Sequence, residues 1–161
     1  MKKIGFGGGC HWCTEAVFQS LRGVERVEQG WIASVAPDKT FSEAVIVHYN
    51  EGISIEVLIE IHLLTHSSSN DHSMRQKYRS AVYYFDNADN QRVLQKIHQL
   101  SIENNTRYIT RSLPYKSFRK NSENQINYYL KNRQAPFCRT YINPKLSVLR
   151  EKYSVQVIDD F

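Results

Sequence analysis

The sequence predicts a single α+β domain spanning residues 1–161, and two observations carry this prediction. Short runs of β-branched and aromatic residues alternate with segments whose apolar residues recur at helical spacing. With 41% hydrophobic and 23% charged residues, the composition is that of a globular protein rather than a disordered one. The predicted elements follow the order β-α-β-β-α-β, which is typical of a ferredoxin-like two-layer sandwich, and a C-terminal extension follows them.

The first strand is expected over residues 4–8, where a short apolar run precedes a helical pattern. That helix should cover residues 11–22, and an extended run from about residue 24 to residue 32 comes next. Pro37-Asp38 is a turn signal. The clearest strand of the chain is predicted over residues 41–49, because this segment is rich in β-branched and aromatic residues.

Ser54 is expected to cap the second long helix, whose apolar residues recur at helical spacing. The polar residues 66–77 predict a long loop, and residues 81–85 a strand that completes the β-α-β-β-α-β unit. Apolar positions between 93 and 100 predict a third helix. Residues 108–113 predict a further strand.

The last part of the chain has a less regular pattern. Ser122-x-x-Gln125 resembles a capping box that opens a tyrosine-rich helix. Phe137-Cys138 then falls in a proline-containing loop. Residues 145–153 are expected to form a final helix.

Three glycines lead directly into a cysteine at the first strand-to-helix turn, and the segment continues as Cys10-His11-Trp12-Cys13. A helix N-terminus lowers the pKa of a thiol, because its unpaired N–H groups and positive dipole end favour the thiolate. Two nucleotide-binding glycine motifs are excluded, since one needs glycine at position 10 and the other a Gly-Lys-Ser/Thr ending. We therefore interpret Cys10 as a nucleophile. The alternative is a turn with an incidental buried cysteine.

The composition also indicates the cellular compartment of the protein and excludes two classes of partner. No stretch approaches the ~20 apolar residues of a membrane span, and the N-terminus does not resemble a signal peptide, so we expect a cytoplasmic protein without a membrane partner. In the cytoplasm, the three cysteines (10, 13 and 138) are expected to serve catalysis or metal binding rather than a structural disulfide. Residues 107–152 hold eleven Lys and Arg against two acids. These basic residues are scattered and accompany no nucleic-acid-binding motif, so we expect no nucleic acid partner.

Three further side chains are candidates for chemistry. Strand alternation places Glu43 on the same face as Val45 and Val47. If that face is buried, desolvation favours the neutral carboxylic acid, which can donate a proton near pH 7, whereas at a fraying strand end it would be an exposed carboxylate. Tyr78 could donate a phenol hydrogen bond, and Trp12 offers an apolar ring beside the cysteine. Ordinary packing is the alternative for both aromatic residues.

A zinc site is the competing interpretation of the same region. Cys10 and Cys13 together with His62 and His66 contain the ligand types of a Cys₂His₂ site, and the two histidines share one helix face. The pairs are much farther apart than in a zinc finger, and no His-Glu-x-x-His pattern is present. The simpler interpretation places both histidines on the surface near a helix C-terminus, where an imidazolium is favoured.

Four segments match one family in the same order along the chain. Gly9-Cys10-His11-Trp12-Cys13-Thr14-Glu15, followed by Phe18 and Gly23-Val24, resembles the Gly-Cys-Phe-Trp-Gly-x-Glu signature of the A-type peptide-methionine sulfoxide reductases. The other segments are Glu43-Ala44-Val45 with Tyr49-Asn50, then Tyr78-Arg79-Ser80-Ala81, then Tyr128-Tyr129-x-Lys131-Asn132 with Pro136-Phe137-Cys138 and Pro144-Lys145. The resemblance extends over nearly the whole chain.

The chain departs from the family pattern at several positions. His11 replaces an aromatic residue and Cys13 replaces a glycine. The segment 32–41 is shortened, so that a tyrosine that contacts the sulfoxide oxygen in the family has no clear counterpart. Ser73 stands in the position of an aspartate, and Lys77 replaces a glutamine.

The resemblance implies a methionine-S-sulfoxide reductase that needs no cofactor and no metal. The Cys10 thiolate attacks the sulfur, Glu43 protonates the oxygen, and Tyr78 adds a hydrogen bond to it. Trp12, together with His11, is expected to hold the S-methyl group. Methionine leaves, and the cysteine becomes a sulfenic acid.

A second thiol then forms a disulfide, which thioredoxin reduces. The family pattern favours Cys138 for this resolving role, while Cys13 is closer in sequence. We expect a monomer that acts on free or protein-bound methionine sulfoxide. Two other functions remain open at this point: a zinc-stabilised or redox-sensing binding module without reductase activity, and a thiol–disulfide oxidoreductase that uses Cys10 and Cys13.

Overall fold

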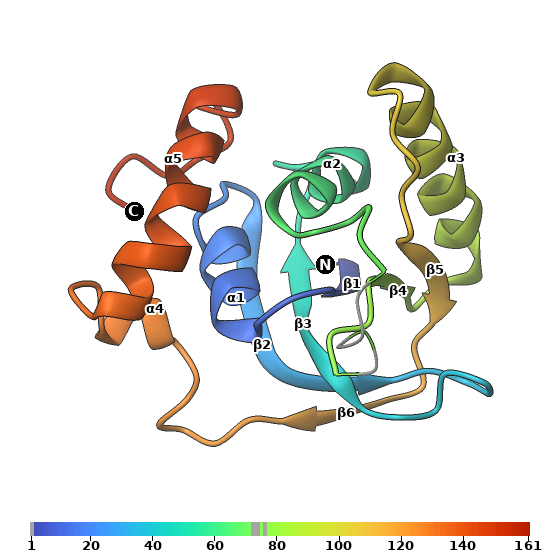
Figure 1. Ribbon diagram of the computed structural model, residues 1–161, viewed down its shortest axis with the longest axis horizontal. Coiled ribbons are helices and arrows are strands. Elements are labelled where there is room, and N and C mark those ends of the chain that lie inside the picture. The colour runs from blue at the N-terminus through green and yellow to red at the C-terminus, as the bar shows by residue number, and fades with distance from the viewer. Residues whose placement is uncertain (1, 72–74, 76) are drawn as a thin grey trace.

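The computed structural model describes residues 2–71, 75 and 77–161, and its centre is one six-stranded sheet (Figure 1). The strands are β1 (Lys2–Gly7), β2 (Val24–Ala33), β3 (Ser42–Tyr49), β4 (Ala81–Tyr84), β5 (Arg111–Pro114) and β6 (Ser117–Lys120). Their spatial order is β5-β4-β1-β3-β2-β6. The β4–β5 pair is parallel and the other neighbouring pairs are antiparallel, so the sheet is mixed.

The described residues form five α-helices and one π-helical segment beside the sheet. They are α1 (His11–Gln19), α2 (Ile55–Thr65), α3 (Asn87–Glu103), α4 (Tyr128–Lys131), the π-helical segment Cys138–Ile142, and α5 (Asn143–Lys152). In Figure 1 the helices α1 and α2 lie over the central strands, α3 lies beside α2, and α4 and α5 lie on the other side of α1. The C-terminal helices α4 and α5 therefore flank the helix that follows β1.

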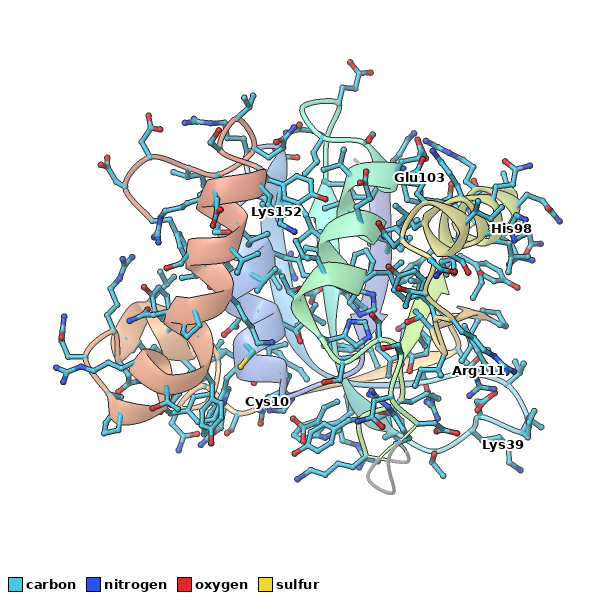
Figure 2. The ribbon with its side chains drawn as sticks, turned by 45° about the horizontal axis from the view of Figure 1, so that its top comes forward. Cys10, Lys39, His98, Glu103, Arg111 and Lys152 are labelled. Carbon is cyan, nitrogen blue, oxygen red and sulfur yellow. The ribbon has the colours of Figure 1, made fainter. Side chains whose placement is uncertain are left out.

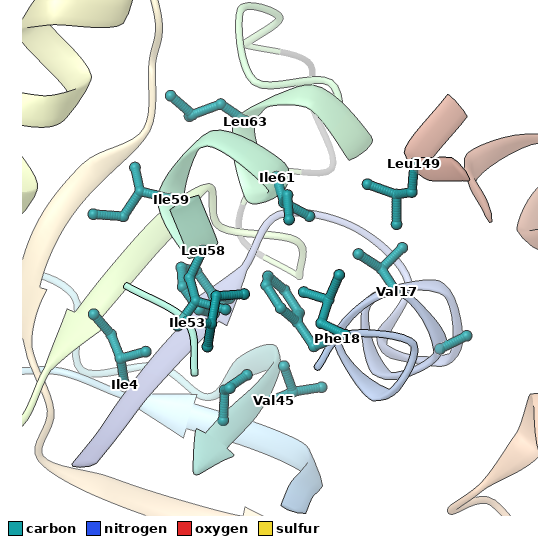
Figure 3. Close-up of a cluster of buried hydrophobic side chains, with 14 of the residues drawn as sticks. Ile4, Val17, Phe18, Val45, Ile53, Leu58, Ile59, Ile61, Leu63 and Leu149 are labelled. Carbon is teal, nitrogen blue, oxygen red and sulfur yellow. The ribbon is translucent and has the colours of Figure 1, made fainter. Parts of the chain in front are cut away.

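The main core lies between helices α1 and α2 and one face of the sheet (Figure 3). Phe18 of α1, Leu58 of α2 and Val45 of β3 are all fully buried there. A smaller cluster on the opposite face includes Ala44 and Ile46 of the same strand. The two clusters confirm the predicted alternation of β3, and they explain why both of its faces are apolar.

Several sequence predictions are confirmed. The mixed α/β class holds, the strand predicted over 41–49 is β3, and Ser54 caps α2 by accepting a hydrogen bond from the Val57 N–H at 3.2 Å. The final helix also forms, as α5. Among the described residues, no helix combines the length and the apolar character that crossing a bilayer requires.

Two local predictions are wrong, and one strand was not predicted. The strand β6 was missed because three of the four residues of Ser117–Lys120 are polar, and the segment becomes a strand only by pairing with the edge of β2. Ser122 and Gln125 do not form a capping box: the Gln125 N–H donates to the carbonyl oxygen of Ser122 at 3.0 Å, and α4 begins later, after Asn127. Cys138 does not lie in a loop, since it begins the π-helical segment.

Candidate active site

Cys10 is the N-cap residue of α1 and follows β1 through Gly8 and Gly9, which confirms the predicted strand-to-helix turn (Figure 2). Its carbonyl oxygen accepts hydrogen bonds from the N–H groups of Cys13 and Thr14 at 3.1 and 3.2 Å. Gly8 has a φ of +147°, which L side chains rarely adopt, and a Cβ there would collide with the imidazole of His66. The turn that presents the cysteine therefore requires glycine at position 8.

The thiol of Cys10 is half-buried and its pKa is lowered. The largest cause is a hydrogen bond from the Cys13 thiol, and the N–H groups of Trp12 and Cys13 act in the same direction. Burial and the nearby charge of Glu43 oppose this shift. The resulting thiolate is stabilised by donors of the first helical turn, as expected for a reactive cysteine at a helix N-terminus.

The Glu43 carboxyl lies beside this turn. It projects from β3 on the face covered by the helices, with 6% of the residue exposed. Its Oε1 accepts a hydrogen bond from the His11 N–H at 3.2 Å, and its Oε2 lies 3.5 Å from Nζ of Lys77. The carboxyl is therefore buried, close to the nucleophile and in contact with a cation.

A cavity of about 340 Å³ opens beside the cysteine. Its lining includes Cys10, Tyr78, Phe137, Tyr141 and Lys145. These residues come from the start of α1, the segment before β4, and the region around the π-helical segment. The fold thus brings the predicted nucleophile and the predicted phenol to one cavity, although 68 positions separate them in the sequence.

Comparison with known proteins identifies the family to which this arrangement belongs. The sequence profile described as "Peptide methionine sulfoxide reductase" matches residues 2–157. The chain belongs to this family. It is 31% identical over 170 residues to the peptide methionine sulfoxide reductase MsrA of Natronomonas pharaonis, covering 94% of each protein.

Solved structures show a similar fold. The chain matches reduced Mxr1 from Saccharomyces cerevisiae with a TM-score of 0.75 and 21% identity, covering 87% of this chain and 90% of that one. It also matches Mxr1 in complex with Trx2, with a TM-score of 0.59 and 19% identity, covering 77% and 83% of the two chains.

The ring of His11 in this peptide methionine sulfoxide reductase lies between β2 and the segment that follows β6. Nδ1 lies 3.2 Å from the Gly30 carbonyl oxygen and Nε2 lies 3.2 Å from Nδ2 of Asn121. Because a carbonyl only accepts, Nδ1 carries the proton and Nε2 accepts from the amide. Burial lowers the pKa of this imidazole, and Nδ1 is also 3.4 Å from Oε1 of Glu43. His11 therefore lies beside the carboxyl as a neutral ring.

Trp12 lies in an aromatic cluster with residues from the C-terminal part of the chain. Its ring stacks on Tyr128 with the centroids 3.9 Å apart and the planes 3° from parallel, and it meets Phe137 edge-on at 5.2 Å. Among the described residues, its indole N–H has no hydrogen-bond partner. The cluster fixes the plane of the indole next to the nucleophile.

The buried carboxyl of Glu15 holds this cluster in place, and sequence reasoning missed its role. Only 1% of Glu15 is exposed, and it accepts hydrogen bonds from the N–H groups of Asn127 and Tyr128 at 2.9 and 3.2 Å. The amide of Gln29 donates a third, at 3.0 Å. The sequence did contain a signal for this role: Glu15 lies on the apolar face of α1, and a buried carboxyl needs hydrogen-bond donors around it.

Two basic residues of the polar loop were also missed. Arg75 donates hydrogen bonds to the carbonyl oxygens of Gly8 and Tyr78 at 2.7 and 2.8 Å, which ties the loop to the turn before Cys10. Lys77 lies 5.1 Å from the centre of the Tyr78 ring, and its pKa is raised by its contacts with Tyr78 and Glu43. Ser73 lies outside the described residues.

The other two cysteines are free and buried. Cys13 is 8% exposed, and the pKa of its thiol is raised because that thiol donates its hydrogen bond to Cys10. Cys138 is fully buried, and burial raises the pKa of its thiol. Both candidate resolving thiols are therefore protonated in the reduced protein.

His62 of α2 is buried, so the predicted surface position is wrong for this histidine, whereas His66, which follows the last residue of α2, is half-buried. His62 is 2% exposed with Nε2 2.8 Å from the Gly7 carbonyl oxygen, and Nε2 of His66 lies 2.8 Å from the Ser80 hydroxyl. Burial lowers the pKa of His62 and lowers that of His66 to about 4. Within the described part of the chain, no three His, Cys, Asp or Glu side chains form a group that could hold a metal.

Proposed function

We propose that this protein reduces methionine-S-sulfoxide to methionine with Cys10 as the nucleophile. One observation carries the proposal: the cysteine with a lowered pKa opens onto the same cavity as Tyr78, while Glu43 is bound to the N–H of the next residue. Membership of the family and the names of its relatives support the same reaction.

In the first step the Cys10 thiolate attacks the sulfoxide sulfur, and the Glu43 carboxyl, as the acid, delivers a proton to the oxygen. The Tyr78 hydroxyl donates a hydrogen bond to that oxygen, where negative charge develops. Methionine leaves, and the oxygen stays on Cys10 as a sulfenic acid. The sulfoxide gains two electrons and the cysteine loses two. The Trp12 ring, with His11 beside the acid, borders the space for the S-methyl group.

The resolving thiol is Cys138. It condenses with the sulfenic acid to give a disulfide and water, and a thioredoxin dithiol then reduces this disulfide by exchange. Cys13 is less suited to attack, because it lies in the first turn of α1 directly after Cys10 and a disulfide between the two would need a tight geometry. The solved complex of Mxr1 with Trx2, in which Mxr1 has the same fold as this chain, supports a thioredoxin as the reductant.

The fold assignment belongs to the same proposal. We infer that β1, α1, β2, β3, α2 and β4 form a ferredoxin-like unit, because the order β4-β1-β3-β2 with antiparallel neighbours is the one this topology requires. Strands β5 and β6 and the C-terminal helices extend it.

A single-turnover experiment tests the reaction. The reduced protein is mixed with each epimer of N-acetylmethionine sulfoxide, and the methionine formed and the thiols lost are counted without a reductant. We expect the S epimer alone to react, Cys10→Ser to form no product, and Glu43→Gln to react about 10²-fold more slowly or worse. Cys138→Ser should complete one turnover but not cycle with thioredoxin. Product from Cys10→Ser would refute the proposal, and full cycling by Cys138→Ser would transfer the resolving role to Cys13.

A further inference from the structure

We propose that Lys145 binds the free α-carboxylate of the substrate, so that the site prefers free or C-terminal methionine sulfoxide to a residue inside a peptide chain. This inference rests on the proposed function and names its substrate class. It starts from the walls of the cavity beside Cys10, which include a lysine from the far end of the sequence.

The position of Lys145 is fixed by a neighbouring helix. The residue lies in the first turn of α5, and its Nζ donates a hydrogen bond to the carbonyl oxygen of Thr65, the last residue of α2. An ammonium group has three N–H donors, and this bond uses one of them. Because Lys145 also lines the cavity, its remaining donors are available there to an acceptor on a ligand.

The charge around the cavity favours an anion at this point. No aspartate or glutamate occurs among the described residues that line it. The histidine in the wall, His66, is neutral at pH 7 because burial lowers its pKa to about 4. Within the described part of the chain, no carboxylate lies within 4.0 Å of Lys145, whereas Lys77 has Glu43 as its partner. Lys145 is thus the cation of this wall that a ligand can neutralise.

The shape of free methionine sulfoxide matches this arrangement. Its sulfoxide and its carboxylate are separated by a short aliphatic chain, so one small cavity can hold both ends. Phe137 and Tyr141, whose ring centroids are 4.9 Å apart, give the cavity an apolar wall for that chain. A residue inside a peptide presents a neutral amide instead of a carboxylate, and it would leave the lysine without its ionic partner.

A matched pair of substrates isolates this interaction. N-acetylmethionine-S-sulfoxide and its N-methylamide share the sulfoxide and the acetyl group, and they differ only in the carboxylate. We expect the wild-type protein to have a higher kcat/KM for the acid. In Lys145→Met, KM for the acid should rise about fivefold to tenfold while the values for the amide stay constant, and Lys145→Arg should keep most of the preference.

Lys152→Met is the control variant, because Lys152 is an exposed lysine at the other end of α5 from Lys145 (Figure 2). An equal change in KM for the acid and the amide in Lys145→Met would overturn the proposal. A wild-type protein with the same kcat/KM for both substrates would overturn it as well.

Protection of Cys10 from iodoacetamide tests the site without catalysis. N-acetylmethionine should protect the thiol better than its methylamide in the wild type, and this difference should disappear in Lys145→Met. If the wild type reduces neither sulfoxide, the proposed function fails, while the protection difference still decides the role of Lys145.

Discussion

The N–H of His11 donates a hydrogen bond of 3.2 Å to Oε1 of Glu43, which ties the buried acid of β3 to the residue directly after the nucleophile. The bond joins two segments that are 32 positions apart. The bond also holds the Glu43 carboxyl at a fixed place relative to Cys10, because it links the first turn of α1 to the strand β3. The other carboxyl oxygen faces Lys77, so the acid lies between a backbone donor and an exposed cation.

Replacing Cys13 with serine or alanine should raise the pKa of Cys10. The hydrogen bond from the Cys13 thiol is the largest influence that lowers it, and its removal leaves burial and Glu43 less opposed. Alkylation of Cys10 by iodoacetamide, measured from pH 5 to pH 10, should then reach half its maximal rate at a higher pH than in the wild type. Alanine should have the larger effect, because serine keeps a donor. An unchanged profile in both variants would show that the donor comes from elsewhere.

Lys77→Met should slow the single-turnover reaction about tenfold without weakening the fold. The Lys77 ammonium lies between Glu43 and the ring of Tyr78, where positive charge stabilises a substrate oxygen that is becoming negative. Lys77→Arg keeps the charge and should retain most of the rate. Lys116→Met, at an exposed lysine in the turn between β5 and β6, serves as the control. Equal single-turnover rates for Lys77→Met and the wild type would show that this lysine does not act in the reaction.

Gly8→Ala should lower the free energy of unfolding by about 1–3 kcal/mol, because φ at this position is +147°. The new methyl group would also collide with His66, which makes the upper part of this range the expectation. Gly9→Ala is the matched control, since a Cβ there meets no atom within 4 Å. Urea unfolding of both variants checks the difference, and similar losses in both would contradict the role given to Gly8.

Glu15→Gln should cost about 1–3 kcal/mol of stability, because one buried N–H of Asn127 or Tyr128 would then face an amide NH₂ instead of an acceptor. The pKa of Glu15 is raised, chiefly by burial. A carboxyl whose pKa is higher in the folded state contributes stability that is present below its unfolded pKa and is lost as pH rises through the folded value. The difference in stability between wild type and Glu15→Gln should therefore shrink as pH rises from about 4 toward neutrality.

Urea unfolding of both proteins at several pH values measures this trend. The fluorescence of Trp12 should change as well, because Glu15 holds the Tyr128 ring against it. A difference that grows with pH would contradict the assignment.

Local pattern and residue identity were enough to find the strand-to-helix turn with Cys10 as the N-cap, the alternating strand with Glu43 on its helix-covered face, and the Ser54 cap. Each depends on residues close together in the chain, whose spacing fixes which side a side chain faces. Four separate motifs also pointed to the family that the comparison identifies.

The other features of the fold and of the site depend on contacts between segments that are distant in the sequence. The burial of His62 depends on the Gly7 carbonyl oxygen and the position of His66 on the Ser80 hydroxyl, and no helical periodicity reveals those partners. In the same way β6 forms only beside β2, and two of the three donors to Glu15 lie more than one hundred positions away. Lys145 lines the cavity of Cys10 and bonds to Thr65, 80 positions earlier. A buried polar group is stable only where the fold supplies its partner, and that partner is set by packing rather than by sequence spacing.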